Sequence, residues 1–131
     1  MGFFEKMFKS ERDISREEIK KVPWIEITNP EMLDEISQGS HDRPAVILKH
    51  STSCGISRMV LRQFEMDYNI EMEKADLYFL DLLRYREISN KIASKFNVPH
   101  ESPQLIIIRD GRVVYDASHS AISADSLKEF L

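Results

Sequence analysis

The stretch AVILKHSTSCGISRMVLRQFE, residues 45–65, holds the patterns of a strand, a polar loop and a helix in direct succession. Its first six residues, AVILKH (45–50), form a nearly continuous apolar run, as expected for a strand that is covered on both faces. Apolar residues then recur at helical spacing from Cys54 to about Met72. This succession predicts an α/β fold in which Cys54 lies between the end of a buried strand and the start of a helix.

The flanking segments continue this alternation of strands and helices. The expected strands lie at residues 24–27, 45–50, 75–83 and, as a hairpin through Asp110-Gly111, 104–118. The expected helices lie at residues 30–38 after the Asn29 cap, 54–72, 86–96 and from Ser123 onward. The resulting order, β-α-β-α-β-α-β-β-α, predicts a central mixed sheet flanked by helices, an arrangement that resembles the thioredoxin-like fold.

We expect one domain, residues 23–131, because 131 residues are too few for two well-packed ones. Residues 1–22 read as a helical or flexible appendage. Apolar side chains cluster near its start beside Lys6 and Lys9, so a helix that binds a partner or a membrane surface stays open as an alternative to a packed-back helix.

Composition excludes several classes of function. The net charge is −4, from 18 basic and 22 acidic residues, so no overall positive field favours nucleic acid. No apolar run approaches the roughly 20 residues that cross a membrane, and the start of the chain lacks a signal-peptide pattern. Cys54 is the single cysteine, which rules out an internal disulfide. We therefore expect a cytoplasmic protein.

The position of Cys54 favours a reactive thiol over a buried, inert one. The first N–H groups of a helix have no intrahelical acceptor and carry partial positive charge, so a thiolate there is stabilised and its pKa falls below about 8.5. The groups expected to stabilise this thiolate come from His50, Ser53, Gly55, Ile56 and Ser57. For His50 two interpretations stay open, an imidazolium beside the thiolate or a solvated histidine at the strand end.

Ser57 lies three residues after Cys54, in the sequence CGIS. A C-x-x-C oxidoreductase has its second cysteine at this position, and a hydroxyl cannot displace a bound thiol from a disulfide. A second thiol must therefore come from outside the chain. The sequence predicts a one-cysteine, or monothiol, chemistry.

Three motifs, KHSTSCGIS (49–57), HESPQ (100–104) and DGRVVYDASH (110–119), resemble those of the monothiol bacilliredoxins, the YtxJ-like group of thioredoxin-fold proteins. The resemblance covers about residues 24–131. It implies that Cys54 takes bacillithiol from S-thiolated client proteins, and that a further low-molecular-weight thiol then reduces it. It also implies that no cofactor is bound, and that Ser102, Pro103 and Gln104 form a substrate-binding element around a cis-proline. Gly55 departs from the family, which often has proline there.

Other interpretations remain open. CGIS also resembles the CGFS motif of monothiol glutaredoxins, which hold a [2Fe–2S] cluster, although DASHSAIS (116–123) lacks the glycine pair of that family. A non-catalytic interaction module with the same fold is a further alternative. A metal site is not expected, because the spacings of the histidines match no metal motif; these are His41, His50, His100 and His119.

Overall fold

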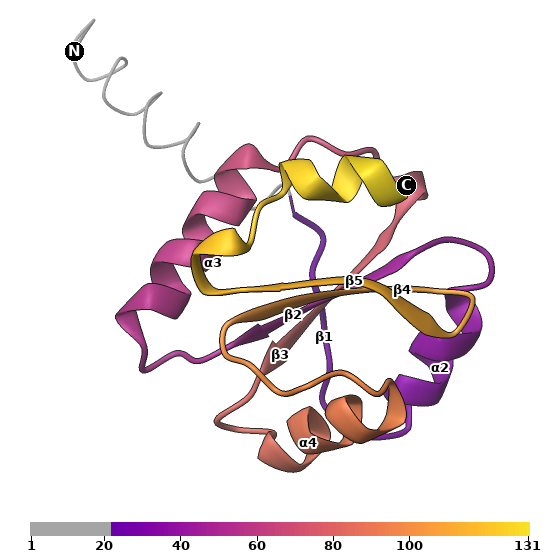
Figure 1. Cartoon of the computed structure of the whole chain (residues 1–131), viewed down its shortest axis with the longest axis horizontal. Helices are drawn as coiled ribbons and strands as arrows, with labels where there is room; N and C mark the ends of the chain where they lie inside the picture. Colours follow the sequence, from indigo (N-terminus) through magenta and orange to yellow (C-terminus); the bar gives the residue numbers. More distant parts are fainter. Residues whose placement is uncertain (1–21) are drawn as a thin grey trace, which may run out of the picture.

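The computed structural model describes residues 22–131, and they form a five-stranded sheet with helices on both faces (Figure 1). The appendage predicted at residues 1–22 therefore lies outside the described residues, apart from Val22, which is buried. Within residues 22–131, no helix is both long and apolar enough to cross a membrane.

The sheet is mixed, as the sequence predicts. Its strands are β1 (Ile25–Glu26), β2 (Ala45–His50), β3 (Asp76–Asp81), β4 (Gln104–Arg109) and β5 (Arg112–Ser118). They are ordered β1-β3-β2-β4-β5 across the sheet; β1, β3 and β2 run parallel, and β4 and β5 are antiparallel to their neighbours. The carboxyl end of β2 is thus adjacent to the start of β4 and the end of β5. In an open α/β sheet this edge is where functional sites form.

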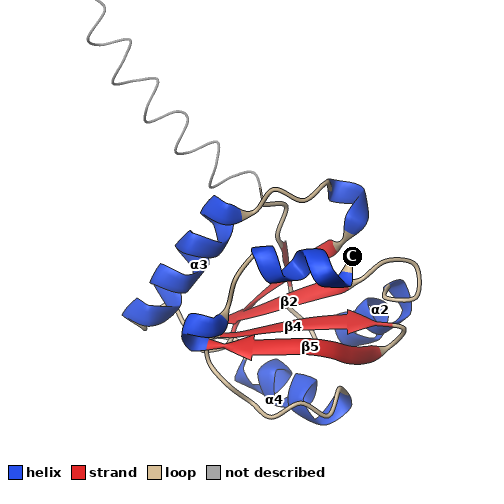
Figure 2. Cartoon of the chain, turned by 45° about the horizontal axis from the view of Figure 1, so that its top comes forward, coloured by secondary structure: helices blue, strands red, loops and turns tan. Residues whose placement is uncertain are grey.

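Two helical layers cover the sheet (Figure 2). The α-helices are α2 (Met32–Gly39), α3 (Gly55–Asp67) and α4 (Arg86–Lys95), and short 3-10 segments are η1 (Met72–Lys74), η2 (His119–Ala121) and η3 (Asp125–Phe130). One core joins α3 and η3 to the sheet, with Phe64 and Leu127 at its centre. The other joins α2 and α4 to the opposite face through Leu33, Ile88 and Ile92. Alternate residues of β2 face these two cores.

Several helix boundaries differ from the prediction. The helix after Cys54 ends at Asp67 and not near Met72, because Tyr68 turns to an extended backbone and buries its ring in the core. The expected last helix is the 3-10 segment η3. Its N-cap is Ala124, so the expected Ser123 cap is wrong; the Ser123 hydroxyl lies one residue earlier and accepts the N–H of Asp125 at 3.2 Å.

The Asp110-Gly111 turn forms as the sequence predicts. Both residues have left-handed backbones, with φ of 55° and 76°, as a tight two-residue hairpin requires. The turn also docks on the end of α2: Ser40 accepts the N–H of Asp110 at its carbonyl (3.0 Å) and the N–H of Gly111 at its hydroxyl (2.8 Å).

Trp24 is half-buried just before β1. Its ring packs against Phe64 and Phe79 at centroid distances of 5.6 and 5.8 Å. Its Nε1–H donates to the Glu65 carboxylate at 2.8 Å. Trp24 therefore ties the edge of the sheet to α3.

Candidate active site

Cys54 caps the N-terminus of α3. Its backbone is extended, with φ −102° and ψ 123°, and its carbonyl accepts the N–H of Arg58 at 3.2 Å, the first bond of the helix. Its own N–H donates to the carbonyl of Ser51 at 3.2 Å, which closes the turn that leads out of β2. The thiol is unbridged and partly exposed. This placement at the strand-to-helix junction leaves the sulfur accessible to a partner.

The surrounding groups lower the pKa of the Cys54 thiol. The largest effect is the hydrogen bond from the backbone of Ser57, followed by that from the backbone of Ile56. The Ser57 side chain and the charge of Arg58 lower this pKa further, and only partial burial of the thiol opposes them. Ser57 Oγ is buried and forms no hydrogen bond to the residues described, so its proton is available to a thiolate at Cys54.

The other residues predicted around the thiolate take different places. Gly55 is the exposed first residue of α3, and Ile56 contributes its N–H while its side chain is exposed. Ser53 is exposed, and its hydroxyl lies 3.4 Å from that of Ser51. Ser53 is not among the groups that shift the pKa of Cys54.

His50 differs from both interpretations of its role. Its side chain is only 3% exposed, so it is not a solvated histidine at the strand end. Burial lowers the pKa of His50, and although Asp81 and the backbone of Ser57 oppose this, the net direction is down. The lowered pKa favours a neutral ring at neutral pH, which does not support the interpretation of His50 as an imidazolium beside the thiolate. His50 Nδ1 and Asp81 Oδ1 are both buried without a hydrogen-bond partner among residues 22–131.

Lys49, beside His50 in β2, is fully buried on the other face of the sheet. Its ammonium donates to the carbonyl of Ser89 in α4 at 3.3 Å and lies 3.3 Å from His100 Nδ1. Burial lowers the pKa of Lys49 from 10.5 to about 8. At about 1.4 kcal/mol per pKa unit, keeping Lys49 charged lowers the free energy of unfolding by about 3 kcal/mol. Sequence reasoning missed this cluster, although a lysine inside an apolar run was its signal.

The segment before β4 contains a cis Ser102–Pro103 peptide bond. Gln104, which was predicted to belong to the substrate-binding element, has a fully buried side chain. Its amide donates to the carbonyl of Pro99 at 2.9 Å and accepts the N–H of Glu101 at 3.2 Å. Because the amide is occupied within its own loop, Gln104 holds that loop together. Pro103 is buried and Ser102 is half-buried.

A hollow of about 550 Å³ lies along the first turns of α3 and begins at Gly55, the residue that follows Cys54. Its walls are partly apolar; the lining residues are Gly55, Ile56, Arg58, Met59 and Arg62. Ile56 and Met59 are 58% and 73% exposed. The first residues of α3, which follow Cys54 directly, thus border an open, partly apolar surface with two guanidinium groups.

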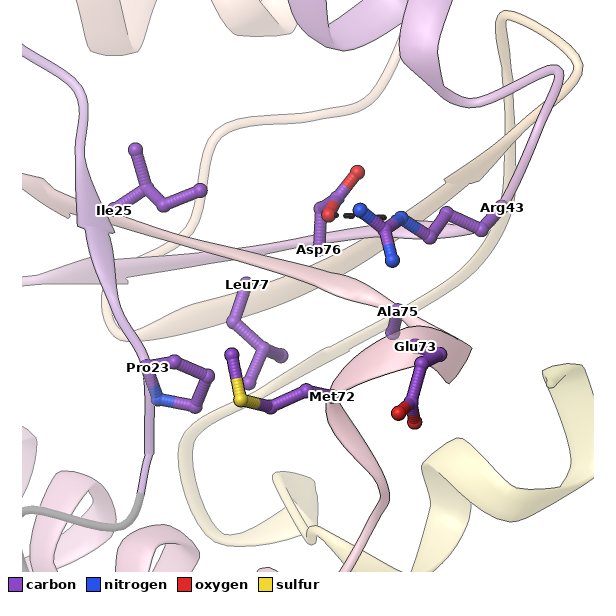
Figure 3. A pocket seen from close by; sticks show the side chains of 8 residues that line it. All are labelled: Pro23, Ile25, Arg43, Met72, Glu73, Ala75, Asp76 and Leu77. Carbon is purple, nitrogen blue, oxygen red and sulfur yellow. Dashed lines mark ion pairs between the residues drawn. The ribbon is translucent and has the colours of Figure 1, made fainter.

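A second hollow, of about 490 Å³, lies at the amino end of β3 (Figure 3). It is lined by Pro23, Ile25, Arg43, Met72, Glu73, Ala75, Asp76 and Leu77. The figure shows Arg43 and Asp76 forming an ion pair in its lining; their Nε and Oδ1 atoms are 3.0 Å apart. None of these residues is a thiol, hydroxyl or imidazole nucleophile, so this hollow offers no counterpart to Cys54. Within residues 22–131, no three potential metal ligands lie close enough together to hold an ion.

Comparisons with known proteins agree with this geometry. A solved thioredoxin-fold protein, proposed to be an oxidoreductase, is 29% identical, with a TM-score of 0.70 over 85% of this chain and 95% of its own. Thioredoxin f from spinach chloroplast (long form; TM-score 0.60, 18% identity, 88% and 89% covered) and Fasciola hepatica thioredoxin (0.58, 19%, 80% and 93%) share the fold. The model of the family described as monothiol bacilliredoxin BrxC matches residues 25–127. The chain therefore belongs to the monothiol bacilliredoxin family, whose members are thioredoxin-fold thiol oxidoreductases.

Proposed function

We propose that this chain removes bacillithiol, or a similar low-molecular-weight thiol, from mixed disulfides with client proteins. The observation that carries the proposal is Cys54, a partly exposed thiol at the start of α3 whose pKa is lowered by the N–H groups of Ser57 and Ile56. A lower pKa enlarges the thiolate fraction at neutral pH, and the thiolate is the nucleophile in disulfide exchange. The choice of bacillithiol rests on the family.

In the first step, the Cys54 thiolate attacks the sulfur of the small thiol within the client's mixed disulfide. An S–S bond forms between Cys54 and the small thiol as the original S–S bond breaks. The client's sulfur leaves as a thiolate and takes a proton from water. The hollow along α3 gives the client room to approach this sulfur.

In the second step, another molecule of the small thiol, ionised by loss of its proton to water, attacks the small-thiol sulfur bound to Cys54. Its disulfide dimer is released, and Cys54 leaves as a thiolate. A thiol of low pKa is a good leaving group, so the same N–H groups that favour attack also favour this release. Ser57, at the position of the second cysteine in C-x-x-C oxidoreductases, has no sulfur to compete with the incoming thiol.

Two elements receive roles in this scheme. We assign the N–H groups of Ile56 and Ser57 and the Ser57 hydroxyl to the Cys54 thiolate. We assign the backbone of Ser102, next to Pro103, to the client, which it would pair with like an added strand. We place the reaction in the cytoplasm, where small thiols keep protein cysteines reduced.

Intact mass spectrometry tests the proposal. The chain is incubated in parallel with oxidised bacillithiol and oxidised glutathione, beside a Cys54→Ser variant. We expect one bacillithiol adduct that the variant lacks. An adduct with glutathione alone would contradict the choice of thiol and leave the chemistry intact, whereas no adduct with either would contradict the enzymatic role.

The CGIS motif also leaves an iron–sulfur carrier to be tested. Anaerobic purification would then give a brown protein whose charge-transfer absorption is lost in Cys54→Ser. We expect a colourless protein. A non-catalytic module would instead keep its function in Cys54→Ala and lose it when residues 1–22 are deleted, the reverse of what a monothiol enzyme predicts.

A further inference from the structure

Lys49 carries a charge where an apolar side chain is the ordinary choice. It lies in the fully buried strand β2, and no carboxylate pairs with it anywhere in residues 22–131. Replacing a buried ionic group by an apolar one of similar volume is often neutral or stabilising. Stability therefore does not explain this lysine, and its contacts must be considered for another role.

The side-chain contact of Lys49 is with the imidazole of His100. An ammonium has only donors, so the Lys49 contact at 3.3 Å requires His100 Nδ1 to accept and the His100 ring to be neutral, with its proton on Nε2. The hydroxyl of Ser89 lies 3.2 Å from the same nitrogen, whose single lone pair it shares with Lys49, and the carbonyl of Ser89 accepts from Lys49. Two buried groups thus fasten His100 from inside the protein, while His100 itself belongs to an exposed loop.

The backbone on both sides of His100 is held as well. Gln104 bonds the carbonyl of Pro99 and the N–H of Glu101. Gln104 pairs with Lys49 across β2 and β4. Lys49 and Gln104, neighbours in the sheet, therefore both hold the loop of residues 99–103. Lys49 contacts a side chain of the loop, and Gln104 bonds its backbone. The next residues in that loop are Ser102 and Pro103.

We propose that Lys49 is a positioning residue for client binding: through His100 it fixes the 99–103 loop, so that the Ser102 backbone is held ready to pair with the client. Lys49 does not touch the client or Cys54. The inference rests on the proposed function and adds to it a determinant of client affinity on the side of the sheet opposite α3. It predicts that affinity for the client can be lost while the thiol stays fully reactive.

The test compares Lys49→Met, which keeps an unbranched side chain, one atom shorter, and removes the charge, with Lys91→Met on the exposed surface of α4. The probe is a single-cysteine protein that carries bacillithiol, with bacillithiol as reductant. We expect Lys49→Met to raise KM for the client about tenfold and to change kcat less than about twofold. Alkylation of Cys54 by iodoacetamide and the thermal midpoint should not fall, and Lys91→Met should match the wild type.

A second measurement reports on the contact itself. The charge of Lys49 contributes to lowering the pKa of His100, together with burial. We expect NMR titration to give a higher pKa for His100 in Lys49→Met than in the wild type. A lysine that merely fills space, with its ammonium turned away from His100, would leave this titration and KM unchanged.

His100→Ala removes the same link from the exposed side, where folding should not depend on it. We expect its KM to rise as in Lys49→Met, and the double variant to be no worse than either single one, as for two residues that act through one contact. Normal KM in both variants would overturn the inference while leaving the proposed function standing. A wild-type chain that fails to reduce the thiolated probe would instead overturn the proposed function.

Discussion

Lys49 and His50 are consecutive residues of β2, both buried and both basic, and they face opposite sides of the sheet. On the α4 side, the Lys49 ammonium meets a carbonyl and an imidazole nitrogen. On the α3 side, His50 Nδ1 has no hydrogen-bond partner among the described residues. Two adjacent residues of one strand thus differ in their buried polar groups: the ammonium of Lys49 has hydrogen-bond partners, and Nδ1 of His50 has none among the described residues.

We interpret this difference between the two faces of the sheet as two separate tasks: the α4 side fixes a loop, and the α3 side supports the chemistry of Cys54. On the α4 side, the polar side chains of Lys49 and Gln104 form hydrogen bonds that fix the loop of residues 99–103. On the α3 side, His50 is influenced by Asp81 and by the backbone of Ser57, which in turn lowers the pKa of Cys54. His50, Ser57 and Asp81 each have a buried side-chain polar atom without a hydrogen-bond partner among the described residues. Such atoms are rare because each costs stability. The fourth one among the described residues, the hydroxyl of Tyr68, lies in the same α3-side core. We therefore expect the α3 side to carry the chemistry.

The largest expected effect tests that assignment. Cys54→Ser should lower the rate of client reduction at least about 1000-fold, because a serine hydroxyl is not ionised at neutral pH and the chain has no other thiol. Ser53→Ala is the matched change on the neighbouring residue, and its rate should stay within about twofold since Ser53 contacts Ser51. Initial rates with a thiolated protein measure both. Activity retained in Cys54→Ser would move the chemistry away from the α3 side.

The next effect concerns the cost of the charge on Lys49. Its pKa is about 8 in the folded chain and about 10.4 in an unfolded one. Between these values the unfolded chain binds more protons, so the free energy of unfolding should rise with pH, by at most about 3 kcal/mol. Lys49→Met should lack this rise. Urea unfolding from pH 7 to 10 compares the two chains, and parallel curves would mean that the ammonium is better solvated than its burial indicates.

His50 should show the corresponding effect in acid. Burial lowers its pKa, so below about pH 6.5 the unfolded chain binds the extra proton and the wild type loses stability relative to His50→Leu. The effect should be smaller than that of Lys49, because Asp81 favours the charged ring. Thermal unfolding between pH 5 and 7 measures it. If the two chains kept a constant difference, His50 would be charged in the folded state after all.

The smallest effect is expected at the start of α3. A Cβ on Gly55 meets no atom within 4 Å, so Gly55→Ala should stabilise the chain by about 0.5–1 kcal/mol. Cys54 alkylation should keep its pH profile, since the N–H groups of Ile56 and Ser57 remain. Gly111→Ala is the control in the opposite direction, because φ is +76° and the new Cβ would lie 3.3 Å from Ser37 Oγ. A shifted profile in Gly55→Ala would show that the flexibility of the glycine tunes the thiol.

Local patterns were sufficient to predict most of the fold. Asp110-Gly111 specifies a tight turn by its own backbone preferences, and the apolar runs at β2 and β4 require cover on both faces. The end of α3 was not predictable in the same way. Apolar residues at helical spacing continue past Asp67, and only the packing of Tyr68 into the core decides where the helix stops.

The site was predictable to the same extent. Cys54 follows a buried strand and precedes a helix, so its electrostatic environment comes from the adjacent backbone. The protonation of His50 and the hydrogen bonds of Gln104 depend on burial by segments distant in sequence, which the neighbouring residues do not reveal. The contact between Lys49 and His100 joins positions 51 apart in sequence. The lysine in an otherwise apolar strand was a visible anomaly, but its partner was not.

Trp24, the chain's single tryptophan, gives the molecule its own fluorescent reporter. Its indole is hydrogen-bonded to Glu65 on α3 and packs edge-on against Phe79, whose ring centroid lies 5.3 Å from that of His50. Any tilt of α3 when a small thiol becomes attached at its tip would change the polarity around the indole. Emission in a stopped-flow instrument would then follow loading and unloading of the sulfur without a dye or a coupled assay.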